Sequence, residues 1–344
     1  MRVEVEDGTL RTIESHPDNR ATPEGVCLKG LSYIERVYAK DRILHPLQRT
    51  SRGDFERISW DAALNRISAE LTVARENHGP RSGFFYTGSG TKGLLNEVSL
   101  DFWRLYGGCT TTFGDLCWPA GLEATRLTLG DNKHNAPWDL VNARVIIFWG
   151  KNPAETNIHQ MRFVEEAMDN GARVVVIDPR RTQSAEGAEL LVQIRPGTDG
   201  ALALGIAHLL IARQTIDETF IRAHVHGYKE FAAMVREFPP DRVAEITDVP
   251  IEVIERLADL VGSTAPLSIC AGFGMQRYTN SAQTMRALIA LLAITGNIGK
   301  PGAGWIYANL QSSIFNPVRE PLALYPPDTD DDPIRVSVST ARLG

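Results

Sequence analysis

The 344-residue sequence contains only four cysteines, and none of them is close to another. Cys27, Cys109, Cys117 and Cys270 are spread along the chain, so we expect no disulfide framework. Neither a CxxC nor an HxxxH pair is present, so the spacing of a structural zinc site is missing. No apolar run is long enough to span a membrane. The first fourteen residues alternate like a strand and lack the apolar core of a signal peptide.

Positive charge is also scarce. Lysine and arginine number 36 against 42 aspartates and glutamates, which gives a net charge of −6. No basic stripe is present, which argues against a nucleic acid as partner. The composition, 43% hydrophobic and 23% charged, is that of a globular protein. A chain of this length has room for two or three domains.

Three apolar segments between residues 144 and 204 each end in a polar turn. Val145–Trp149 and Val174–Ile177 are short, β-branched runs of the kind buried in a parallel sheet. The third segment, around residues 190–194, leads into an apolar helical stretch at 201–212. Strand, turn and helix that repeat roughly every thirty residues predict a doubly wound, mostly parallel sheet, so the predicted fold class is α/β.

The turns after these strands carry polar residues where doubly wound sheets bind their ligands. A carboxylate after a strand suits ribose hydroxyls or the N–H edge of guanine, and arginine near a helix N-terminus suits a pyrophosphate. Neither GxGxxG nor GxxxxGK[ST] occurs within residues 144–204. Any one of these residues could be an ordinary turn residue, but three successive polar turns favour nucleotide binding. The candidates are Asn152, Glu155, Thr156, Asp178, Arg180, Gly197, Thr198 and Asp199.

Other elements follow from local patterns. We expect a β-hairpin over residues 3–14, a helix capped by Ser59, and a buried strand in GFFYTGSG followed by a second helix. Helices are expected at 119–129 and 280–295, with a buried strand in LSICAGFG between them. From Trp305 onward the sequence is predicted to be mostly loop.

Two cysteines could carry chemistry. Cys117 precedes a helix that starts at Pro119, where the helix dipole favours a thiolate. That suits a metal ligand or a nucleophile, although cysteine is equally common as a small buried hydrophobe. Cys27 stands alone before Lys29, and a cluster-bound thiolate needs three companions. A structural cysteine and a solvated lysine are the simpler interpretation there.

The stretch GFGMQRYTN, which contains Gly274 and Met275, follows a predicted strand. Glycine there lets the backbone approach a ligand closely. Gln276 and Arg277 offer donors to a phosphate or to pterin-like heteroatoms. A plain glycine turn is the alternative.

Taken in order, these segments resemble the molybdopterin oxidoreductase family, which is related to dimethyl sulfoxide reductase and includes formate dehydrogenases, nitrate reductases and polysulfide reductases. The resemblance covers essentially the whole chain. It implies two-electron redox transfer at molybdenum or tungsten held by two molybdopterin guanine dinucleotides, with electrons passing through a [4Fe-4S] cluster. The segments are CLKG, RISWDAAL, GDLCWPAG, WGKNPAETN, IDPRRTQSA, RPGTDGALAL, GFGMQRYTN and LLAITGNIGKPGAG.

The resemblance also implies residue roles. Cys117 matches the protein ligand of the metal, Cys27 matches the last of four cluster cysteines, and Lys29 matches the lysine between cluster and pterin. The residues that match the binding turns of one dinucleotide are Asn152, Glu155, Thr156, Asp178, Arg180, Gly197 and Asp199. Gly274 and Met275 are also expected to bind the cofactor. Formate dehydrogenases place a histidine after the metal ligand, where this chain has Trp118, so formate is not favoured as the substrate.

By the same resemblance, this chain corresponds to about the first half of such an enzyme. Three cluster cysteines would precede Met1, and a C-terminal barrel would follow Gly344. The expected partners are a small redox substrate and an iron–sulfur subunit, in the cytoplasm or periplasm. The alternatives are a non-catalytic electron-transfer scaffold and an inactive remnant. The expected division is 1–52 (part of the cluster domain), 53–112 (start of a discontinuous α/β domain), 113–300 (Rossmann-like dinucleotide domain) and 301–344 (return of the discontinuous domain).

Overall fold

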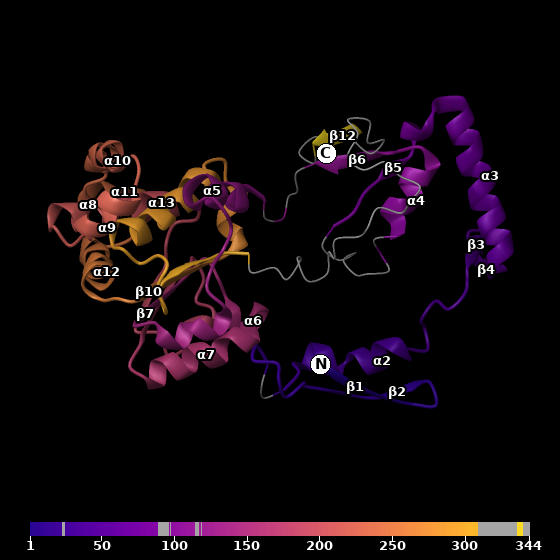
Figure 1. The fold of residues 1–344 in the computed structure, drawn as a ribbon, viewed down its shortest axis with the longest axis horizontal. Coiled ribbons are helices and arrows are strands. Elements are labelled where there is room, and N and C mark those ends of the chain that lie inside the picture. The colour runs from indigo at the N-terminus through magenta and orange to yellow at the C-terminus, as the bar shows by residue number, and fades with distance from the viewer. Residues whose placement is uncertain are drawn as a thin grey trace. The chain divides into compact units, whose positions relative to one another are not determined.

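The computed structural model describes residues 1–22, 25–88, 96, 98–113, 117, 119–308 and 336–339 (Figure 1). The chain divides into two compact units, which are described separately. Unit 1 contains Met1–Ile34 and Cys117–Asn309, and unit 2 contains Glu35–Leu116 and Leu310–Gly344. The four-part division expected from the sequence stays a prediction.

The core of unit 1 is a five-stranded sheet in which every neighbouring pair is parallel. The chain enters the sheet at its central strand, continues outward on one side, and then returns to build the other side. The two directions separate between β7 and β10, which makes this the switch point where such sheets bind ligands. In spatial order the strands are β11 (Gly304–Ile306), β10 (Leu267–Ala271), β7 (Val145–Trp149), β8 (Arg173–Ile177) and β9 (Leu190–Val192).

The central strands are buried along their whole length because helices cover both faces of the sheet. All five residues of β7 and of β10 are buried. This explains why their sequences are continuously apolar rather than alternating. The predicted α/β class is confirmed. The loop predicted from Trp305 onward is wrong at its start, because β11 pairs with β10 there. Three residues are too few to show a strand pattern.

One face of the sheet packs on α7 (Ile158–Asp169) and η3 (Pro137–Asn142), with Phe148 and Phe163 in the shared core. The other face packs on a larger helical layer (Figure 1). In that layer α8 is apolar on all sides, which its contacts with α11, α12 and α13 explain. The layer comprises α5 (Pro119–Leu129), α8 (Asp199–Ala212), α9 (Glu218–His224), α10 (Tyr228–Met234), α11 (Pro240–Thr247), α12 (Ile251–Ser263) and α13 (Ser281–Ile294).

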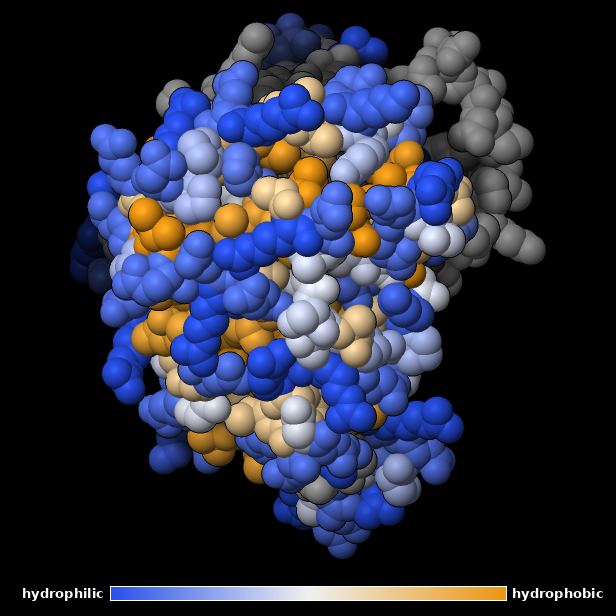
Figure 2. Space-filling model, turned by 90° about the vertical axis from the view of Figure 1, so that its left-hand side faces the viewer, coloured by the Kyte–Doolittle hydropathy of each residue, from blue (hydrophilic) through white to orange (hydrophobic). Residues whose placement is uncertain are grey.

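Short elements connect these parts. They are α6 (Pro153–Thr156), η4 (Gln183–Ala185), η5 (Val235–Glu237) and η6 (Phe273–Arg277). On the face formed by α8 to α12, hydrophilic side chains surround smaller apolar patches, as expected for helices that turn one side to the core (Figure 2). Among the described residues, no helix is both long and apolar enough to cross a membrane.

The N-terminal part of unit 1 begins with the predicted hairpin, formed by β1 (Arg2–Glu6) and β2 (Thr9–Glu14). Two short helices follow, α1 (Leu28–Leu31) and α2 (Tyr33–Val37), and the second of them crosses the boundary into unit 2.

Unit 2 is a smaller α/β assembly with a parallel sheet in the order β12-β6-β5. Its longest helix starts where the sequence predicted, because Ser59 Oγ accepts a hydrogen bond from the Ala62 amide. The elements are β3 (Leu47–Arg49), β4 (Phe55–Arg57), α3 (Trp60–His78), η1 (Pro80–Ser82), β5 (Phe84–Phe85), α4 (Val98–Tyr106), β6 (Thr110–Phe113) and β12 (Val336–Ser339).

At the switch point the backbones that leave β7 and β10 are in close contact. The Gly272 amide donates a hydrogen bond to the Trp149 carbonyl at 2.9 Å. A Cβ on residue 272 would lie 1.7 Å from the carbonyl oxygen of Gly150. Only glycine fits there without moving one of the two central turns.

We therefore expect Gly272→Ala to destabilise the protein by about 1–3 kcal/mol, the usual effect of overpacking a close contact. Gly274→Ala is the matched control, because a Cβ there meets nothing within 4 Å. Urea unfolding of both variants measures the difference. Equal urea midpoints for Gly272→Ala and Gly274→Ala would show that the turns after β7 and β10 can move apart without loss of stability.

Candidate functional site

The candidate site lies at the carboxyl edge of the central sheet, where the turns after β7, β8 and β10 meet a segment before α8. The sequence placed its candidate residues on these turns, and the structure puts them there. One GxGxxG pattern does occur elsewhere, at residues 88–93, after β5. Its residues 89–93 lie outside those the structure describes.

Cys117 is attached to this edge through Gln276. Gln276 is buried on η6, directly after β10, and its side-chain nitrogen donates a hydrogen bond to the Cys117 carbonyl. Its side-chain oxygen accepts from the Gly121 amide at 2.9 Å. Cys117 is half-buried and precedes α5, which begins at Pro119 as predicted. The thiol-bearing residue therefore lies beside the turn that follows β10.

Tyr307 is a third member of this cluster, and the sequence did not single it out. Its hydroxyl donates a hydrogen bond to the Gln276 side-chain oxygen at 2.6 Å. Burial, reinforced by the nearby Cys117, raises the pKa of the Tyr307 hydroxyl well above its ordinary value. The phenol therefore stays protonated at neutral pH and acts as a donor.

The turns after β7 and β8 are joined by side chains. Ser184 Oγ donates to Asn152 Oδ1 at 2.6 Å and accepts from the Ala154 amide at 3.0 Å. Thr156 Oγ1 donates to the Asn152 carbonyl at 2.8 Å, while Glu155 is exposed. Asn152 therefore holds the turn together, and the exposed Glu155 carboxylate is accessible to a ligand.

The turn after β8 carries a carboxylate, cations and a free hydroxyl. Asp178 Oδ1 accepts from the Arg180 amide at 2.8 Å, and the Arg180 side chain is exposed. Thr182 is 6% exposed, and its buried Oγ1 has no hydrogen-bond partner within the described part of the chain. A buried hydroxyl without a partner is costly unless something binds it.

Asp199 opens α8 and is 6% exposed. Trp149 Nε1 donates to its carboxylate at 2.9 Å. Burial raises the pKa of the Asp199 carboxyl, the Trp149 hydrogen bond opposes this, and the neighbouring Asp178 adds to the rise. Nearby, the ring of Tyr278 lies against Gly197. The two carboxylates, Asp178 and Asp199, are thus brought together from different strand ends.

Lys151, directly after β7, is a partly buried lysine that the sequence analysis overlooked. Burial lowers the pKa of Lys151, and its amino group makes no hydrogen bond or ion pair with the described residues. Its charged neighbour would be Cys270, but burial raises the pKa of that thiol to about 11. Cys270 is therefore neutral at pH 7 and does not balance a charge on Lys151.

Gly274 and Met275 belong to η6 and differ in exposure. Gly274 is exposed, whereas Met275 is 4% exposed and packs on Gly150 at the start of the β7 turn. Met275 therefore packs against the backbone of the turn that follows β7. The cofactor-binding role predicted for both residues stays a prediction.

Cys27 and Lys29 lie in the N-terminal part of the chain, at α1. Cys27 is half-buried, and its carbonyl accepts the Gly30 and Leu31 amides at 2.8 and 3.1 Å, while Lys29 is exposed. In the described residues, no group of three or more His, Cys, Asp or Glu side chains could hold a metal ion. The cluster role of Cys27 stays a prediction.

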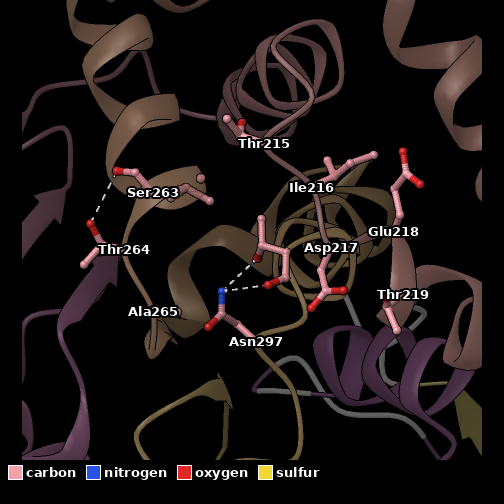
Figure 3. A pocket seen from close by; sticks show the side chains of 12 residues that line it. Thr215, Ile216, Asp217, Glu218, Thr219, Ser263, Thr264, Ala265 and Asn297 are labelled. Carbon is pink, nitrogen blue, oxygen red and sulfur yellow. Dashed lines mark hydrogen bonds between the residues drawn. The ribbon is translucent and has the colours of Figure 1, made fainter.

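A separate cavity of about 490 Å³ lies within unit 1, next to the segment that leads into the amino end of β10 (Figure 3). Its main polar groups already serve the fold. Asp217 caps α9 by accepting from the Phe220 amide, and Asn297 Oδ1 accepts from the Leu267 amide. None of the residues predicted to bind a ligand lines it.

The chain is similar to known proteins along most of its length. Residues 42–326 match the family model described as molybdopterin oxidoreductase. The probable oxidoreductase YoaE of Bacillus subtilis is 34% identical over 315 residues, covering 90% of this chain and 46% of YoaE. Dimethyl sulfoxide reductase DmsA of Escherichia coli is 31% identical, covering 88% of this chain and 42% of DmsA. The structure of acetylene hydratase from Pelobacter acetylenicus superposes with a TM-score of 0.72 at 30% identity, covering 88% of this chain and 42% of that one.

The chain belongs to the molybdopterin oxidoreductase family, as the sequence motifs predicted. It spans less than half the length of these relatives. The residues present fit a molybdopterin cofactor with its metal. Cys117 lies beside the turn after β10, where its thiolate suits the metal. Lys151 and the Thr182 hydroxyl, which lacks a hydrogen-bond partner among the described residues, suit an anionic group.

Asp199→Asn tests the electrostatics of the site without a ligand. Because burial raises the pKa of Asp199, the folded protein loses stability as pH rises through that pKa, while the unfolded carboxyl ionises near its ordinary value of about 3.9. We expect the variant to match the wild type near pH 4 and to be more stable at pH 7. Urea unfolding across this pH range measures the difference, with the exposed Glu186→Gln as charge control. If Asp199→Asn is less stable than the wild type at pH 7, the ionised Asp199 carboxylate does not destabilise the folded protein, and the prediction is wrong.

Proposed function

We propose that this chain binds a molybdopterin guanine dinucleotide and supplies the Cys117 thiolate as the protein ligand of molybdenum or tungsten in an oxidoreductase. One observation carries the proposal: Gln276, which directly follows β10, binds the Cys117 carbonyl and so holds the thiol beside the strand ends. A thiolate is a soft ligand that suits such a metal. When bound, the cofactor would supply two-electron redox chemistry.

The residues of the chain would bind and orient that group. Lys151 and Arg180 would offer positive charge to the pyrophosphate, and Thr182 would offer its hydroxyl. Among the described residues, Lys151 and Thr182 Oγ1 have no hydrogen-bond partner, and the Arg180 side chain is exposed. Asp178 and Asp199 would accept from guanine N–H groups or ribose hydroxyls. Asn152, tied to Ser184, would keep the two turns at a fixed separation.

The proposal extends to electron flow and substrate as the family resemblance implies. Two dinucleotides would hold the metal, and a [4Fe-4S] cluster with Cys27 as one ligand would pass electrons past Lys29 to an iron–sulfur subunit. The names of DmsA and of the Bacillus subtilis assimilatory nitrate reductase, 31% identical to this chain, describe reductions of small oxygen-bearing molecules. We propose a substrate of that class.

The direct test is the metal and nucleotide content of the full-length protein, produced anaerobically with molybdate. The wild type should carry about one Mo or W per chain together with guanine nucleotide, and Cys117→Ala should lose metal and activity while it keeps the nucleotide. Cys109→Ala, a buried cysteine of unit 2, is the control. If the wild type contains neither metal nor pterin, the proposed catalytic function is wrong, and an electron-transfer scaffold is the function that remains.

Lys151→Met tests the pyrophosphate site. Removing the unbalanced ammonium should raise the melting temperature of the ligand-free protein, because a buried charge without a partner is costly. Inorganic pyrophosphate should raise the melting temperature of the wild type but not that of the variant. The exposed Lys229→Met serves as control. An equal pyrophosphate response in all three proteins would place the anion elsewhere.

A further inference from the structure

The carboxamide of Gln276 joins three segments that are distant in the sequence. Its nitrogen donates to the Cys117 carbonyl, and its oxygen accepts from the Gly121 amide at 2.9 Å and from the Tyr307 hydroxyl at 2.6 Å. A backbone N–H can only donate, so the partner at Gly121 fixes which end of the carboxamide is the oxygen. The nitrogen must then face Cys117.

Tyr307 is held in place by its ring. The side chain is fully buried, stacked on Trp305 with centroids 5.8 Å apart, and in edge contact with Phe273 at 5.2 Å. A Cβ on residue 121 would lie 2.3 Å from the Tyr307 ring, so the ring packs directly on the first turn of α5. The hydroxyl therefore has little freedom to turn away from Gln276.

A second connection reinforces the same helical turn. Trp305 Nε1 donates to Thr125 Oγ1 at 3.0 Å, and Thr125 Oγ1 donates to the Gly121 carbonyl at 2.7 Å. The N–H and the carbonyl of Gly121 are thus bonded to the side chains of Gln276 and Thr125. Those two side chains are in turn bonded to Tyr307 and Trp305. The start of α5 is fixed by residues that lie about 180 positions later in the chain.

We propose that Tyr307 is the positioning residue for Cys117: its hydroxyl locks the Gln276 carboxamide, which holds the Cys117 peptide so that the thiol meets the metal from one fixed direction. The inference rests on the proposed role of Cys117 as metal ligand. Its structural half, the restraint on Cys117 and on the start of α5, does not depend on that role.

The isosteric change Tyr307→Phe isolates the hydroxyl, because the ring that packs on Gly121 stays in place. The Gln276 oxygen would keep only the Gly121 amide as a donor, so the carboxamide would keep its orientation but be held less firmly, and its hydrogen bond to the Cys117 carbonyl would weaken. Tyr106→Phe is the matched control. It removes a hydroxyl that belongs to unit 2, outside unit 1, and that donates to the Leu71 carbonyl at 2.5 Å.

The first readout needs no cofactor. Amide hydrogen exchange at Gly121 should be about fivefold faster in Tyr307→Phe than in the wild type, the factor that one typical hydrogen bond contributes, and unchanged in Tyr106→Phe. Alkylation of the Cys117 thiol is a companion measurement, and it should also be faster in Tyr307→Phe than in the wild type. Gln276→Met removes all three hydrogen bonds and should accelerate both the exchange at Gly121 and the alkylation of Cys117 more than Tyr307→Phe does. A near-ultraviolet circular dichroism spectrum like that of the wild type shows that each variant is folded.

The second readout uses the metal-loaded protein. X-ray absorption should show a wider spread of metal–sulfur distances in Tyr307→Phe at unchanged metal content, a change that a general loss of stability does not produce. Wild-type exchange at Gly121 together with a wild-type metal spectrum in Tyr307→Phe overturns the proposal. If the wild type carries no metal, the proposed function fails, and Gly121 exchange and Cys117 alkylation alone decide whether Tyr307 restrains the segment.

Discussion

The candidate site depends on one buried carboxamide. Gln276 lies in the turn after β10 and makes three side-chain hydrogen bonds. Its partners are Cys117 just before α5, Gly121 in the first turn of α5, and Tyr307 just after β11. Each of these segments is fixed by the core at one end and would be an ordinary surface loop at the other. In a buried setting every such bond is worth more than it is in water, because a broken one leaves a polar group unpaired. The carboxamide thus converts three loops into one rigid edge.

The fold could be predicted from sequence wherever the chain repeats a period. The continuous apolar runs of β7 and β8, each closed by a polar turn, predicted a parallel sheet covered on both faces, and the structure confirms it. Ser59 and Pro119 marked helix starts that the structure reproduces. The same logic failed at β11, whose three residues become a strand only by pairing with β10. Pairing of that kind is a tertiary effect that no local pattern records.

The site was predictable in part, and the split has a physical cause. Asp178 and Asp199 follow strand ends, so sheet topology alone placed them on one edge. Lys151 also follows a strand, but its importance lies in burial without a counter-charge, which requires knowing that Cys270 is neutral. Gln276 stood in a motif that suggested ligand donors, whereas its amide is used to hold Cys117. Tyr307 gave no signal, because its role depends on a glycine about 186 positions earlier.

The unbalanced ammonium of Lys151 and the buried carboxyl of Asp199 also bear on the life of the protein before it receives a ligand. Both charges oppose the folded state when the edge is empty, and a ligand that offers an anion to Lys151 and hydrogen-bond donors to Asp199 would remove that opposition. Empty molecules should therefore open more often at this edge than loaded ones. Proteases that cleave opened chains would then degrade the ligand-free protein faster than the ligand-bound protein.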